Sequence, residues 1–137
     1  MQAQAYLNFD GRCEEALEFY RKAIGAEVTA LVRFQDSPEP CGDGMVSPGC
    51  EGKVMHSSFR IGDTAVMASD CHCKGQPKFE GFSMALNPKT TAEAERLFAA
   101  LADGGQVGMP LTKTFWSPSF GILTDRFGLS WMISVAP

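Results

Sequence analysis

The sequence predicts an α+β fold built of two βαβββ modules whose strands form a cup-shaped mixed sheet. Internal similarity is the first observation, because residues 5–30 have a diverged counterpart in residues 83–109. Each copy has the pattern of a strand, a helix and a strand, and a hairpin pattern follows each. Two copies are too few for a solenoid, so the copies are expected to pair and bury their apolar faces. We therefore predict one domain, residues 1–137, with pseudo-repeat modules 1–77 and 78–137.

The first module is read from its hydrophobic periodicity. Residues 4–9 alternate polar and apolar side chains, as a half-buried strand does. Residues 13–24 repeat apolar side chains at helical spacing, carry glutamates in their first turns and end at Gly25. Further strands are expected at 27–34, 53–61 and 64–69. Residues 35–52 form a loop rich in proline and glycine, and loops of this length are commonly lids or binding loops.

The second module repeats this order after an irregular stretch at residues 70–80. Its helix is expected at residues 91–102, where Thr90 or Thr91 supplies a capping hydroxyl and a glycine pair follows the end. Its strands are expected at 82–86, 106–111, 119–124 and 129–135. Trp131 lies on the apolar side of the last strand, which predicts a core position for its ring.

Composition limits the classes of partner. The chain of 137 residues is 45% hydrophobic, which is enough for a substantial core. Its net charge of −4 comes without long runs of like charge, so no nucleic acid and no anionic membrane surface is an expected partner. No apolar stretch is long enough to span a bilayer, and the first four residues do not resemble a signal peptide. We expect a cytoplasmic protein with a small-molecule ligand.

The odd number of cysteines, without the spacing of a disulfide scaffold, predicts reduced thiols. The five cysteines are Cys13, Cys41, Cys50, Cys71 and Cys73. Cysteine and histidine are zinc ligands, but the run Cys71-His72-Cys73 cannot form a tetrahedral site by itself. With Cys41 and Cys50 in the preceding loop, a loop zinc site remains an alternative to solvent-facing residues. Whether Cys71, His72 and Cys73 bind a metal stays open.

Strand alternation gathers polar side chains on one surface. In the middle strand, one face carries Val54, His56, Ser58 and Arg60, and the other carries Met55, Ser57, Phe59 and Ile61. The second set suits packing against a helix, so the first set faces away from it. In the first strand, Tyr6 and Asn8 fall on one side, opposite Leu7 and Phe9. A sheet with one helix-covered face and one polar concave face forms a cup that can take a ligand.

Each candidate residue in this cup has an alternative interpretation. His56 is a candidate catalytic group, although a histidine in a strand can also be purely structural. Arg60 is a candidate ligand anchor or a solvated strand end. Tyr6, Asn8 and Ser58 are candidate substrate-binding residues on the polar surface. Trp116 and Phe120 are expected to wall the pocket.

Motifs along the whole chain resemble the PhnB-like branch of the vicinal oxygen chelate superfamily, which includes glyoxalases, bleomycin-resistance proteins and extradiol dioxygenases such as dihydroxybiphenyl dioxygenase. The motifs are YLNFDGRCEEALEFY at residues 6–20, VMHS at 54–57, RIGD at 60–63, WSP at 116–118 and DRFGLSWM at 125–132. The resemblance implies paired βαβββ modules in a cup and a homodimer in which two subunits complete each cup. Members of this branch also have a ubiquinone-biosynthesis methyltransferase label, but the sequence has no glycine-rich nucleotide-binding loop after a strand.

The resemblance also indicates where metal-dependent members of the superfamily place their ligands. Those positions fall on Tyr6, on Met67 or Ala68, on Ser83 and on Met132. Divalent metals in proteins need several oxygen or nitrogen donors such as carboxylates and imidazoles. We therefore expect no metal site at these positions and no other cofactor.

Two classes of function remain. In the first, the cup binds a small, largely apolar molecule, with Tyr6, Asn8, His56 and Arg60 fixing its polar end. In the second, the protein is a lyase, isomerase or dioxygenase type of enzyme in which His56 is a general acid or base, or a metal ligand. The sequence favours binding, because no nucleophile and base occur together at a recognisable spacing.

Overall fold

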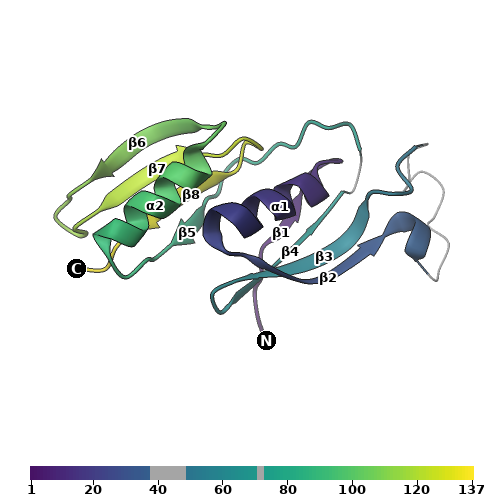
Figure 1. Cartoon of the computed structure of the whole chain (residues 1–137), viewed down its shortest axis with the longest axis horizontal. Coiled ribbons are helices and arrows are strands. Elements are labelled where there is room, and N and C mark those ends of the chain that lie inside the picture. The colour runs from purple at the N-terminus through teal and green to yellow at the C-terminus, as the bar shows by residue number, and fades with distance from the viewer. Residues whose placement is uncertain (38–48, 71–72) are drawn as a thin grey trace. The chain divides into compact units, whose positions relative to one another are not determined.

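A computed structural model of the chain describes residues 1–37, 49–70 and 73–137 (Figure 1). The chain divides into two compact units, residues 1–77 and 78–137. Within the described residues, each unit contains a four-stranded mixed sheet and one α-helix of twelve residues. The predicted βαβββ order is confirmed in both units.

The first unit has its four strands in the order β1-β4-β3-β2, with β1 parallel to β4 and the other pairs antiparallel. The elements are β1 (Tyr6–Asn8), α1 (Cys13–Ile24), β2 (Glu27–Arg33), a short 3-10 helix (Phe34–Asp36), β3 (Val54–Ile61) and β4 (Thr64–Ser69). Helix α1 packs against one face of this sheet (Figure 1). On this face Tyr20 stacks on Phe59 with ring centroids 6.1 Å apart. Both rings are fully buried, so this face forms the core of the unit.

The two ends of α1 are stabilised in different ways. Gly25 follows the helix with φ of 70°, a left-handed conformation that glycine adopts without steric cost, as predicted. The first turn has no capping side chain from Arg12. Instead, the Asp70 carboxylate accepts hydrogen bonds from the backbone N–H groups of Gly11 at 2.7 Å and Cys13 at 2.9 Å. A residue that follows β4 therefore caps α1.

The second unit repeats this arrangement with strand order β5-β8-β7-β6. Its elements are β5 (Met84–Leu86), α2 (Thr91–Ala102), β6 (Gln106–Thr112), β7 (Phe120–Thr124) and β8 (Ser130–Ser134). The Thr90 hydroxyl accepts a hydrogen bond from the Glu93 N–H at 3.1 Å and caps α2, as predicted. Trp131 is fully buried, which confirms its predicted core position, and its indole N–H donates to Asp125 at 2.9 Å.

The strands differ from the prediction mainly at their ends. The first strands of both units, β1 and β5, are shorter than expected, at three residues each. Strand β6 runs through Pro110, which it tolerates because an edge strand does not need every ladder donor. Among the described residues, no helix has the length and apolarity needed to cross a membrane.

The expectation of reduced thiols was wrong for one pair, because Cys50 and Cys73 form a disulfide with Cα atoms 6.3 Å apart. The cause is the antiparallel pairing of β3 and β4. This pairing brings the segment before β3 and the segment after β4 to the same end of the sheet. Cys41, Cys71 and His72 lie outside the described residues, so the loop zinc alternative remains a prediction for them. Cys50 and Cys73, as disulfide sulfurs, are not thiolate ligands here.

Candidate functional site

One row of side chains crosses all four strands of the first sheet on the face turned away from α1. Tyr6 lies opposite Met67, Met67 opposite Ser58, and Ser58 opposite Ala30. Asn8 and His56 share this face because they lie two residues from Tyr6 and Ser58 along their own strands. We call the surface formed by Tyr6, Asn8, Ala30, His56, Ser58 and Met67 the open face.

Tyr6 and His56 meet on the open face. The Tyr6 hydroxyl and Nδ1 of His56 are 3.1 Å apart and hydrogen-bonded, and their ring centroids are 5.7 Å apart. The two residues come from β1 and β3, are 50 positions apart in the sequence, and have β4 between them. Tyr6 is 49% exposed, so the pair presents both a hydrogen-bonding group and ring surface to solvent.

Arg60 lies at one end of this face and is already paired. Its guanidinium is 2.6 Å from the carboxylate of Glu27, the residue directly opposite it on β2. Both side chains are more than half exposed, so the pair contributes little to stability, but it compensates the charge of Arg60. The predicted anchor for an anion therefore has an anion beside it within the chain.

Asn8 and Ser58 have different surroundings. The Asn8 side-chain oxygen accepts a hydrogen bond from the Asp10 N–H at 3.0 Å, which shapes the turn after β1. Ser58 lies in the middle of the row, with its backbone carbonyl accepting a hydrogen bond from the Thr29 hydroxyl. Asn8 therefore stabilises this turn in addition to lying on the open face. The Ser58 side chain is partly exposed.

Trp116 and Phe120, the predicted aromatic wall, lie in the second unit and contact each other edge to face at 5.3 Å. Phe115 adds a second edge contact to Trp116 at 4.8 Å and is 97% exposed. The Thr114 hydroxyl fixes this loop by accepting hydrogen bonds from the backbone N–H groups of Trp116 and Ser117. The loop therefore presents a preformed aromatic surface. The sequence analysis identified Trp116 as part of it and missed Phe115.

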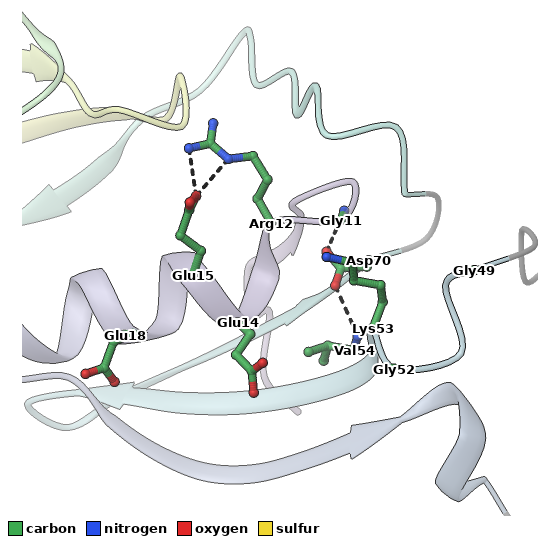
Figure 2. Close-up of a pocket in the computed structure, with 10 residues that line it drawn as sticks. All are labelled: Gly11, Arg12, Glu14, Glu15, Glu18, Gly49, Gly52, Lys53, Val54 and Asp70. Atoms are coloured by element: carbon green, nitrogen blue, oxygen red, sulfur yellow. Dashed lines mark hydrogen bonds and ion pairs between the residues drawn. The ribbon is translucent and has the colours of Figure 1, made fainter.

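A cavity of about 660 Å³ lies elsewhere, between the first turns of α1 and the start of β3 (Figure 2). It is lined by Gly11, Arg12, Glu14, Glu15, Glu18, Gly49, Gly52, Lys53, Val54 and Asp70. Val54 is fully buried among these residues, so its predicted place beside His56 on the polar face was wrong. A register shift between Val32 and Arg33 on the neighbouring strand accompanies this change.

The acidic residues of the cavity have structural partners. Glu15 pairs with Arg12, Glu14 with Arg33, and Glu18 with Arg21. The Asp70 carboxylate also accepts a hydrogen bond from the Val54 N–H at 3.0 Å, so it joins the start of α1 to the start of β3 (Figure 2). We therefore attribute the polar lining of this cavity to the stability of the fold and place the candidate site on the open face.

The positions at which the resemblance would place metal ligands do not fit a divalent metal in this chain. Tyr6 and Met67 are register partners on the open face, and the Ser83 hydroxyl is 2.7 Å from that of Ser130. Met132 lies opposite Ala85. A phenol, thioethers and a hydroxyl are a poor donor set for a divalent cation. Within the part of the chain that the structure describes, no three His, Cys, Asp or Glu residues gather as a possible metal site.

Comparison with known proteins gives the same family from sequence and structure. A model of the family described as 3-demethylubiquinone-9 3-methyltransferase matches residues 2–134. Protein YjdN of Escherichia coli is 35% identical over 98% of this chain and 95% of its own length.

Solved structures agree. PA1353 of Pseudomonas aeruginosa is 44% identical, with a TM-score of 0.84 over 99% of this chain and 98% of that chain. A Bacillus cereus PhnB protein, described as a putative 3-demethylubiquinone-9 3-methyltransferase, is 28% identical, with a TM-score of 0.79 over 99% of this chain and 100% of that chain. The fosfomycin resistance protein FosX of Listeria monocytogenes, at 9% identity and a TM-score of 0.62 over 100% of this chain and 93% of that chain, shares the fold. The chain thus belongs to the family described as 3-demethylubiquinone-9 3-methyltransferase, is PhnB-like, and has the glyoxalase and bleomycin-resistance fold.

Proposed function

We propose that the protein binds a small molecule on the open face and holds its polar end with Tyr6 and His56. The observation that carries this proposal is the hydrogen bond between the Tyr6 hydroxyl and Nδ1 of His56, made on an exposed surface by strands that are not neighbours. Nδ1 is engaged by Tyr6, so Nε2 is the ring nitrogen left for a ligand. Met67 and Ala30, in the same row as Tyr6, offer apolar area for the ligand body.

The proposal does not include the methyl transfer named in the family description. The turn from β1 to α1 has a single glycine, Gly11, and a Cβ atom built there would lie 3.1 Å from the Cα of Cys73. The turn from β5 to α2, residues 87–90, has none. Glycine-rich strand-to-helix turns let a backbone approach a nucleotide cofactor, and these two turns do not have that form.

A titration followed by amide NMR tests the binding proposal, with 2-naphthol as a probe that has one hydroxyl on a flat apolar body. We expect saturable shifts in the amides of β1, β3 and β4, and weaker binding to Tyr6→Phe and His56→Gln. Lys22→Ala, on the exposed side of α1, is the control and should bind as the wild type does. Shifts that are absent, or that stay the same in both open-face variants, would refute the proposal.

We also propose a homodimer whose sites combine both subunits, as the family resemblance implies. Light scattering should then give a mass near twice the 14.8 kDa of one chain. Tyr6→Ala and Trp116→Ala should each weaken 2-naphthol binding, and mixing the two variants should restore part of it through hybrid dimers. A monomeric mass, or mixtures that bind no better than either variant, would contradict the shared site.

A further inference from the structure

We propose that the open face selects uncharged ligands whose polar end is a hydroxyl or carbonyl group, and that the Arg60–Glu27 pair is what excludes anions. This inference rests on the proposed function and specifies its ligand class. The surface offers a phenol, an amide, an imidazole and a hydroxyl beside apolar Met67 and Ala30. Two charged side chains at one end of this face, Arg60 and Glu27, form an ion pair and neutralise each other.

The Arg60–Glu27 pair affects which ligands bind because a charged ligand loses water when it binds to the face. A carboxylate or phosphate that settles on the face loses water and needs an uncompensated cation in return. Arg60 has further N–H groups, but an anion that bound them would lie beside the Glu27 carboxylate, which is 2.6 Å from the guanidinium and would repel it. An uncharged hydroxyl avoids both costs.

The polar pair is suited to such a group. Tyr6 and His56 together can donate and accept hydrogen bonds, and the neutral imidazole changes its role with its tautomer. A ligand hydroxyl also donates and accepts, so it can satisfy either tautomer. The Met67 thioether is polarisable and packs favourably on an aromatic body, which places a flat ring system beside the hydrogen-bonding end.

Calorimetric titration with two probes of equal ring size tests this inference. The probes are 2-naphthol, which is uncharged, and 2-naphthoate, which is an anion, at about pH 8 where imidazoles are ordinarily neutral. The wild type should bind 2-naphthol at least about tenfold more tightly, a difference of about 1.4 kcal/mol. Glu27→Gln releases Arg60, so it should raise the affinity for 2-naphthoate and change that for 2-naphthol much less. Glu95→Gln, on the exposed surface of α2, is the matched control and should change neither affinity.

The outcomes separate this inference from the proposed function. Equal or tighter binding of 2-naphthoate by the wild type would overturn the inference while leaving small-molecule binding intact. An unchanged 2-naphthoate affinity in Glu27→Gln would also overturn it, because the pair would then not be the source of the selection. Saturable binding of neither probe would overturn both proposals.

Discussion

The Asp70 carboxylate accepts a hydrogen bond from the backbone N–H of Cys13 at 2.9 Å, although the two residues are 57 positions apart. The same carboxylate accepts hydrogen bonds from the N–H groups of Gly11 and Val54. One fully buried side chain therefore joins the start of α1, the start of β3 and the end of β4. The orientation of α1 over the sheet, and with it which sheet face stays open, depends on this junction.

Replacement of Asp70 should destabilise the whole first unit. In Asp70→Ala, three backbone donors lose their acceptor, and we expect a loss of about 2–4 kcal/mol in the free energy of unfolding. Asp70→Asn keeps one acceptor oxygen and should lose less. Chemical denaturation measures both, with Asp63→Asn in the exposed β3–β4 turn as the control. Equal stability of Asp70→Ala and the wild type would contradict the role of this residue.

The Cys50–Cys73 disulfide can be tested by chemical labelling of the cysteines. Alkylation of free thiols in denaturant, followed by reduction and a second label, should place the second label on Cys50 and Cys73 in the peptide map. The bond closes a loop across 23 positions, so Cys50→Ser with Cys73→Ser should lower the free energy of unfolding by about 3 kcal/mol. If the first label already covers both residues, the pair is reduced, and the stability difference should then vanish.

The buried thiol of Cys13 should make stability depend on alkaline pH. Burial raises its pKa from 9.0 to about 12, against the opposing effect of the hydrogen bond with Ser57. The unfolded chain loses this proton at lower pH than the folded one, so unfolding is favoured as pH rises from about 9 toward 12. The stability of the wild type relative to Cys13→Ala should therefore fall over that range. A difference that stays constant with pH would show that Cys13 ionises equally in both states.

Gly121 on β7 should not accept a side chain. A Cβ atom there would lie 2.8 Å from a ring carbon of Phe98 on α2 and 3.0 Å from the Met109 carbonyl oxygen. We expect Gly121→Ala to lower the free energy of unfolding by about 1–3 kcal/mol through overpacking. Gly108→Ala is the matched control on β6, because its added Cβ would stay 3.5 Å or more from its neighbours. Thermal unfolding compares them, and equal midpoints would count against tight packing at Gly121.

The sequence predicted the helices well because local signals define them. The bounds 13–24 and 91–102 match α1 and α2, since apolar periodicity, Gly25 and Thr90 all act within a few residues of the helix ends. The common face of Tyr6 and His56 could also be derived, because strand alternation is local.

What the sequence did not reveal depends on contacts between distant segments. The Glu27–Arg60 pair follows from the register of β2 against β3, which alternation alone does not fix. The partners of Asp70 and the Cys50–Cys73 bond follow from which loops meet at one end of the sheet. One signal was available: Cys50 precedes β3 by as many residues as Cys73 follows β4, and a hairpin brings such flanking segments together.

The central claim is that Tyr6 and His56 bind a ligand as one unit. A double-mutant cycle on 2-naphthol affinity, with Tyr6→Phe, His56→Gln and the double variant, tests it most directly. If the two side chains hold the same ligand group, each single change should weaken binding and the double variant should be little weaker than either, with a coupling of about 0.5–1.5 kcal/mol. Fully additive losses, or single variants that bind as the wild type does, would contradict the claim.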